Sequence, residues 1–159
     1  MKHLNRFHPL YILATFFWSG CLPKSPGTWG SLAALPFAWV MLTYGGPLAL
    51  AIAAVCLFFA GIPAATWLGN KLGKPDAGQI VVDEVAAMWL VLLAVPLTLP
   101  WWVLAFALFR LFDITKPQPV KWVDAHVKGG FGVMIDDIIA AAYAVGALYI
   151  IQYAISALL

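Results

Sequence analysis

The chain has 159 residues, of which 64% are hydrophobic and only 10% are charged, and its mean hydropathy is +0.91. Soluble domains carry about 25% charged residues, so this composition excludes an ordinary water-soluble protein. It predicts a single integral-membrane domain, residues 1–159. The formal net charge is only +2, which gives no indication of nucleic-acid binding.

The first apolar stretch covers residues 9–18 and follows the basic residues Lys2 and Arg6. A basic start and a short apolar run resemble a signal peptide, but Trp18 stands where a cleavage site requires a small residue. The stretch is also too short to cross a bilayer. We therefore expect it to be retained as an N-terminal interfacial or re-entrant helix.

Five longer apolar runs follow, and Gly/Pro breaks at residues 45–47 and 96–100 separate neighbouring runs. A spanning helix needs about 20 residues, and only two runs have that length. The other three must include polar flanking residues, which in a membrane face protein or a watery cavity. We therefore expect an all-α, polytopic membrane bundle with about five membrane-embedded helices. The five runs are 31–44, 48–68, 85–99, 101–112 and 138–158.

The charged residues follow the alternation of these runs. If all five span, the segments before residue 31, between 69 and 84, and between 112 and 137 share one side of the membrane. Together with Arg110, these segments hold all nine Lys and Arg and all seven Asp and Glu residues. The positive-inside rule places that side in the cytoplasm. The sequence therefore predicts a multi-pass protein with a cytoplasmic charged face.

Five acids lie at the ends of three expected helices, where an unpaired carboxylate is costly. The helix dipole explains an acid at a helix start, but not Asp113 at a C-terminal end or two adjacent pairs at converging ends. A hard cation held by oxygen ligands explains all five. Adjacent helix residues face different ways, so we expect one acid of each pair to face the metal. The metal candidates are Asp83, Glu84, Asp113, Asp136 and Asp137.

Basic residues lie beside these acids. Arg110 precedes Asp113 by three residues, so the two share a helix face, and Arg110 needs a partner because it lies inside the expected span. Lys116 and Lys121 follow in the next loop. Bases and metal-binding acids at one depth favour phosphoryl chemistry, so these three bases are candidate phosphate ligands. Their alternative role is contact with anionic lipid headgroups.

A glycine-containing segment, residues 25–31, leads directly into the first expected span. Backbone N–H groups at a helix start bind phosphate, and glycine allows the phosphate to approach closely. Thr28, Gly30 and Ser31 are therefore further candidates for phosphate or substrate binding. The alternative is an ordinary capped turn.

Four motifs follow one another along residues 25–140. They are Pro26-Gly27-Thr28-Trp29-Gly30-Ser31, Ile80-Val81-Val82-Asp83-Glu84, Phe109-Arg110-Leu111-Phe112-Asp113 and Gly129-Gly130-Phe131-Gly132-Val133-Met134-Ile135-Asp136-Asp137. Together and in this order, they resemble the phosphatidylglycerophosphatase A family. One departure is Ala87, where the family usually has glycine before Met-Trp, and this substitution does not touch the acids.

The resemblance implies a bacterial inner-membrane enzyme of phospholipid biosynthesis. Such an enzyme uses Mg²⁺ to hydrolyse phosphatidylglycerophosphate to phosphatidylglycerol and phosphate, with its active site facing the cytoplasm. The implied partners are the phospholipid substrate and the bilayer, with no obligatory protein partner. The substrate comes from the resemblance alone, whereas the residues themselves indicate the acid cluster. The resemblance carries over the same acids, and the catalytic candidates are Asp83, Glu84, Asp113 and Asp137.

Two routes of hydrolysis remain open, direct attack by water and a covalent aspartyl-phosphate. The sequence lacks the Asp-x-Asp-x-Thr and Cys-x5-Arg signatures of two covalent phosphatase classes. Two other functions are a cation-coupled transporter and a lipid-docking scaffold. The absence of acids from the middle of every apolar run disfavours the transporter, and the scaffold leaves the acid cluster unexplained.

Overall fold

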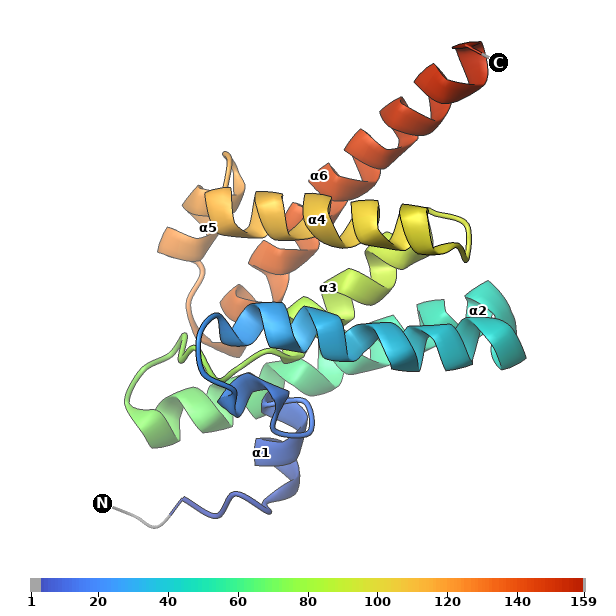
Figure 1. Cartoon of the computed structure of the whole chain (residues 1–159). Helices are drawn as coiled ribbons and strands as arrows, with labels where there is room; N and C mark the ends of the chain where they lie inside the picture. The colour runs from blue at the N-terminus through green and yellow to red at the C-terminus, as the bar shows by residue number, and fades with distance from the viewer. Residues whose placement is uncertain (1–3, 159) are drawn as a thin grey trace.

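The computed structural model describes residues 4–158, and every regular element in this range is helical, which confirms the predicted all-α class. Figure 1 shows the arrangement of the helices. In chain order they are α1 (Pro9–Ala14), the short 3-10 turn η1 (Ser19–Cys21), α2 (Pro26–Leu72), α3 (Val82–Leu92), α4 (Leu99–Thr115), α5 (Val120–His126) and α6 (Gly129–Leu158).

The element α2 consists of two helices that meet at Gly46. Gly46 has φ 70° and ψ −177°, a conformation that glycine adopts without steric cost, and Pro47 follows it. The chain reverses direction at this point (Figure 1). The break predicted at residues 45–47 is therefore confirmed.

Two helical elements are long and apolar enough to cross a membrane, α2 (Pro26–Leu72, its two halves taken together) and α6 (Gly129–Leu158). The run 85–99 was expected to form one helix, but α3 ends at Leu92, and the chain turns before α4 begins at Leu99. Pro96 lies in this turn, where its ring and missing N–H disfavour continuation of a helix. The third apolar run is therefore an 11-residue helix followed by a connection.

The short helix α3 lies at the centre of the bundle and packs against α2, α4 and α6. Nine of its eleven residues are buried, as expected for a helix that is apolar on all sides. The indole Nε1 of Trp89 donates to the carbonyl of Ala34 at 2.9 Å, which ties α3 to α2. This burial fixes the start of α3, where two of the acids lie.

The predicted N-terminal helix is present as α1, with only six residues. Tyr11 and Ala14 are buried, and α1 packs against α2. The N–H of Val81 donates to the carbonyl of Ala14 at 2.9 Å. The N-terminal segment therefore also supports the start of α3.

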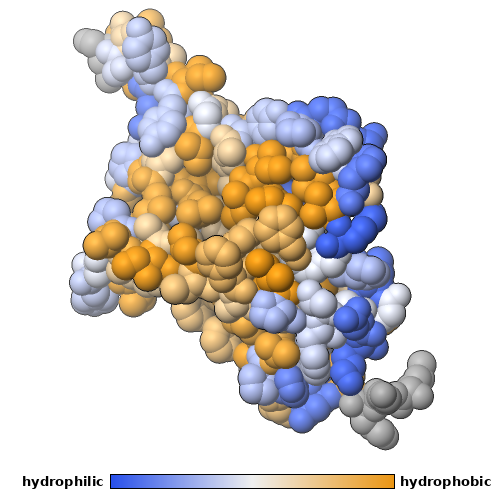
Figure 2. Space-filling view, turned by 180° about the vertical axis from the view of Figure 1, so that it is seen from behind, coloured by the Kyte–Doolittle hydropathy of each residue, from blue (hydrophilic) through white to orange (hydrophobic). Residues whose placement is uncertain are grey.

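Hydrophilic residues gather along one edge of the molecule, and hydrophobic residues cover most of the remaining face (Figure 2). We call this edge the charged end. It contains the start of α2, the connection between α2 and α3, the end of α4, α5 and the start of α6 (Figure 1). The segments expected to share one face of the membrane therefore lie together.

Candidate active site

A cavity of about 430 Å³ opens at the charged end, where α3 and α6 begin and α4 ends. All five predicted acids line it, together with two of the three predicted bases. The predicted residues that line the cavity are Asp83, Glu84, Arg110, Asp113, Lys116, Asp136 and Asp137. Residues from three separate motifs are thus brought to one place.

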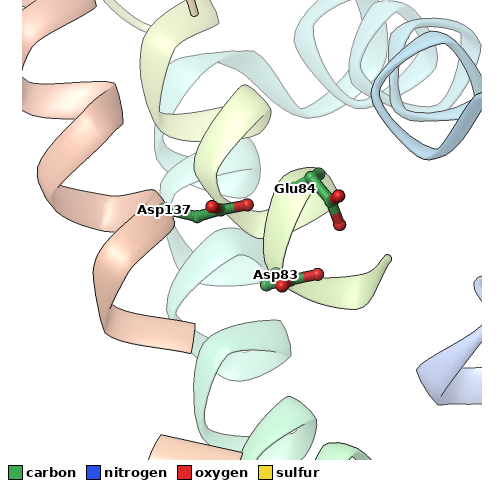
Figure 3. Close-up of side chains that lie close together, drawn as sticks. All are labelled: Asp83, Glu84 and Asp137. Atoms are coloured by element: carbon green, nitrogen blue, oxygen red, sulfur yellow. The ribbon is translucent and has the colours of Figure 1, made fainter. Parts of the chain in front are cut away.

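Three acids form the closest group in this cavity. Asp83 and Glu84 come from the first turn of α3, and Asp137 extends toward them from α6 (Figure 3). One carboxylate oxygen from each lies within 4.8 Å of the others. Both acids of the α3 pair belong to this group, so the expectation that only one of them would face the site is wrong. The group lies around the first turn of α3, where neighbouring positions both reach the cavity.

The carboxylate oxygens of this group are buried and partly unpartnered. Asp83 is 6% exposed and Asp137 is 4% exposed. Asp83 Oδ1, Glu84 Oε2 and Asp137 Oδ2 have no hydrogen-bond partner among the described residues. Buried carboxylate oxygens are costly without a partner, and hard divalent cations bind such oxygens. The three residues therefore fit a divalent cation.

Arg110 lies next to this group, on α4. Its guanidinium donates to Asp113 Oδ2, and Nη1 is 3.9 Å from Glu84 Oε1. The pairing of Arg110 with Asp113 agrees with their predicted shared face. The Nε of Arg110 is buried, and no described residue accepts a hydrogen bond from it. Arg110 is also one of the residues that line the cavity, and a guanidinium in such a place is suited to an anionic oxygen such as that of a phosphate.

Lys116 follows the end of α4 and binds two acids. Its Nζ is 2.8 Å from Asp136 Oδ2 and 3.0 Å from Asp124 Oδ1. Burial acts to lower the pKa of Lys116, but the hydrogen bonds and charges of Asp136 and Asp124 outweigh it and raise the pKa above its ordinary value. Lys116 therefore remains a cation at the mouth of the acid cluster.

The segment 25–31 reaches the cavity through residues other than those predicted. Ser25, Pro26 and Gly27 line it, whereas Thr28, Gly30 and Ser31 are not among its lining residues. Ser31 is buried and its Oγ donates to the carbonyl of Gly27 at 2.9 Å. Gly30 packs against Val81, the residue directly before α3, since a Cβ built on Gly30 would lie 2.6 Å from Val81 Cβ.

Gly27 makes the closest approach from this segment to the acids. A Cβ built on Gly27 would overlap Glu84 Oε1 and lie 3.1 Å from Arg110 Nη1. Only glycine leaves both side chains where they are. The sequence of residues 25–31 does not distinguish Gly27 from Gly30, because the rotation of α2 against α3 decides which glycine faces the acids.

One predicted base lies outside the cavity, and two acids that were not predicted belong to the site. Lys121 is exposed on α5 and is not among the residues that line the cavity. Asp76 lines the cavity from the connection between α2 and α3, and Asp124 binds Lys116 from α5. No sequence spacing pointed to either acid, because loop geometry brings both into place.

Known proteins resemble this chain along most of its length. Residues 12–152 match the family model of phosphatidylglycerophosphatase A. The phosphatidylglycerophosphatase A of Haemophilus influenzae is 41% identical over 155 residues, which cover 96% of this chain and 94% of the relative. That of Escherichia coli is 40% identical over 154 residues, covering 96% of this chain and 88% of the relative.

A third relative carries a different name. A protein of Bacteroides thetaiotaomicron, provisionally named a phosphatidylinositol-3-phosphatase, is 43% identical over 140 residues, which cover 83% of this chain and 86% of the relative. No solved structure matches the chain. The family model covers residues 12–152, and the two bacterial relatives each match 96% of the chain. The chain is therefore a phosphatase and belongs to the phosphatidylglycerophosphatase A family.

Proposed function

We propose that this chain hydrolyses phosphatidylglycerophosphate to phosphatidylglycerol and phosphate in bacterial phospholipid biosynthesis, with Mg²⁺ bound by the acids. One observation carries this proposal: the cavity combines buried, unpartnered carboxylate oxygens with the unpartnered Nε of Arg110. The oxygens suit a cation, and the nitrogen suits a phosphate oxygen. A phosphate ester with its counter-ion satisfies both kinds of atom.

In this proposal, Asp83, Glu84 and Asp137 would hold Mg²⁺. When bound, the ion would supply positive charge for the phosphate oxygens and favour attack by water. Arg110 would donate to a phosphate oxygen from its unpartnered Nε while Nη1 holds Asp113. Lys116 adds a second positive charge at the same opening. These fixed charges match the charge spread over the phosphoryl oxygens in the transition state.

The reaction also requires a group that accepts a proton, and the cavity contains one. Water forms the new bond to phosphorus, the bond from phosphorus to the glycerol oxygen breaks, and the leaving oxygen gains a proton. Asp113 lines the cavity outside the closest group, and Arg110 fixes its orientation. We assign Asp113 as the carboxylate that accepts the proton of the attacking water.

The membrane arrangement is part of the same proposal. The two halves of α2, then α3 with its connection, α4 and α6 form five membrane-embedded segments of the inner membrane. The two helices with spanning length and the gathering of hydrophilic residues at one edge support this arrangement. The positive-inside rule then directs the charged end, and the active site with it, to the cytoplasm. A lipid headgroup reaches the cavity at that interface.

Phosphate release from defined lipids in detergent micelles tests the proposal. The purified chain should release phosphate from phosphatidylglycerophosphate with Mg²⁺ and lose this activity in excess EDTA. Phosphatidylinositol 3-phosphate is the comparison substrate, given the name of the third relative. Asp83→Asn, which preserves side-chain size, is the control for contaminating phosphatases. Equal activity in EDTA, or faster hydrolysis of phosphatidylinositol 3-phosphate, would overturn the proposal.

A further inference from the structure

An apolar groove of about 440 Å³ lies between α4 and α6. Phe112 of α4 lines one side, and six residues of α6 between Ile139 and Ile150 line the other. The rings of Phe112 and Tyr143 are 5.5 Å apart. The hydroxyl of Tyr143 donates to the carbonyl of Gln118 at 2.6 Å, so this ring is fixed against the charged end. The rest of the lining is hydrocarbon.

The groove starts beside the acid cavity and runs away from the charged end. Phe112 directly precedes Asp113, and Ile139 and Tyr143 follow Asp136 by three and seven residues. Residues at these spacings lie along one face of a helix, so the groove continues the face of α6 that carries Asp136. From Ile139 to Ile150 the helix rises about 16 Å. Half of a bilayer's hydrocarbon core is about 15 Å thick, so the groove is about as long as the hydrocarbon layer of one leaflet.

Small residues give the groove its depth. Ala142, Gly146 and Ala147 lie along its floor on α6. A Cβ built on Gly146 would meet no atom within 4 Å, so internal packing does not require glycine at this position. A side chain at residue 146 would therefore begin in open space and extend into the groove.

We propose that this groove holds one acyl chain of the phospholipid substrate whose phosphate lies in the acid cavity. The inference rests on the proposed function, because the phosphate site determines where the acyl chain begins. The groove is apolar, its lining begins at Phe112 and Ile139, four and three residues from Lys116 and Asp136, and it runs along α6 away from the charged end. Lipid tails are as apolar as the groove, so its contribution is orientation of the substrate rather than affinity.

Photo-crosslinking tests where the acyl chain lies, without requiring turnover. The probe is phosphatidic acid with a diazirine at the end of one acyl chain, in micelles that contain excess phosphatidylcholine. After brief irradiation with Mg²⁺, mass spectrometry should find adducts in the segment 146–151. A phosphatidylcholine probe should give about tenfold less adduct there, because it lacks the charge-assisted hydrogen bonds of a phosphate monoester. Equal adducts from both probes would show bulk lipid contact only and overturn the proposal.

Variants of the groove provide a second measurement. Gly146→Leu should abolish the headgroup-selective adduct and lower kcat/KM for phosphatidylglycerophosphate on the order of tenfold, through misplacement of the substrate. Gly146→Ala controls for the change in helix propensity. Ala154→Leu, an exposed position of α6 outside the groove, should change neither quantity. Ala142→Leu replaces Gly146→Leu if the latter does not fold.

The results separate the possible failures. If Gly146→Leu keeps wild-type adducts and kinetics but changes a dimer to a monomer in light scattering, a second copy covers the groove and the proposal is wrong. If the wild-type chain releases no phosphate from phosphatidylglycerophosphate but retains selective adducts that Gly146→Leu removes, the groove assignment holds and the proposed reaction fails.

Discussion

Gly27 offers the sharpest test of the site geometry, because a single methyl group there meets the acid cluster directly. A Cβ on Gly27 would overlap Glu84 Oε1 and would also approach Arg110 Nη1 to 3.1 Å. In Gly27→Ala the Glu84 carboxylate must withdraw by roughly 1 Å to regain ordinary contact. The carboxylate is the free end of a flexible side chain, so it moves while the backbone of α2 and α3 stays in place.

The cost of this shift falls on activity rather than on folding. Glu84 supplies one of the three oxygens that lie within 4.8 Å of one another. A misplacement of about 1 Å at a catalytic group costs on the order of 100-fold in rate. This corresponds to about 2.7 kcal/mol in activation free energy. The free energy of unfolding should change by less than about 1 kcal/mol, below the usual cost of overpacking, because a movable side chain absorbs the methyl.

The assay combines kinetics with thermal unfolding in one detergent. For each variant, kcat/KM for phosphatidylglycerophosphate is measured across a Mg²⁺ titration, and Tm is measured on the same preparation. Gly78→Ala is the first control, because Gly78 also lines the cavity but a Cβ there meets no atom within 4 Å, so both quantities should be retained. Gly30→Ala is the second, because its Cβ would lie 2.6 Å from Val81 Cβ. It should lose about 1–3 kcal/mol of stability by overpacking and keep its activity per folded molecule.

The refuting result is specific. If Gly27→Ala retains kcat/KM and Mg²⁺ dependence within about twofold of wild type, displacement of the Glu84 carboxylate by roughly 1 Å has no effect on the reaction. Glu84 would then not belong to the catalytic group. A matching loss of Tm in Gly27→Ala and Gly30→Ala would refute the argument that the Glu84 side chain absorbs the methyl.

Three further results are expected. Asp83→Asn and Asp137→Asn should each lower phosphate release on the order of 100-fold, the upper range for loss of groups that support a metal site. They should also raise Tm in EDTA, because removal of one acid relieves like-charge repulsion among carboxylates that lie within 4.8 Å of one another. A lower Tm would indicate structural acids instead. Arg110→Lys should lower kcat on the order of 100-fold, because lysine has a single amino group and cannot bind Asp113 and a phosphate with separate nitrogens of a planar guanidinium. A wild-type kcat would show that Arg110 does not bind the phosphate. Lys71 and Lys121 are exposed, so a membrane-impermeant amine reagent should label them only from the cytoplasmic side; labelling in intact spheroplasts would refute the topology.

Local signals predicted the helical framework well. The all-α class followed from composition, and the reversal at Gly46 followed from a Gly-Gly-Pro sequence whose conformational preferences are local. The acid cluster was predictable because a carboxylate among apolar residues raises the free energy of the folded protein. Several carboxylates at one depth therefore indicate a common binding site. Those acids and two of the bases do line one cavity.

Features of the site that depend on how the helices pack together could not be predicted from the sequence. Whether Gly27 or Gly30 faces the acids depends on how α2 is rotated against α3, and nothing in residues 25–31 encodes that rotation. The partnership of Lys116 with Asp124 depends on the fold of α5, which no periodic pattern revealed. The early end of α3 at Leu92 reflects a preference for a turn around Pro96 over a longer helix.

The division of the acid group between α3 and α6 has a consequence for the order of synthesis. Asp83 and Glu84 leave the ribosome together, but Asp137 is made only after α4 and α5 are complete. An 11-residue helix is about 16 Å long and cannot span a bilayer alone, so in the proposed arrangement α3 enters the membrane as a hairpin with α4. Until α6 docks against this hairpin, the third carboxylate is missing. Formation of the complete acid group therefore coincides with the last step of assembly, so an unfinished chain would lack the catalytic group.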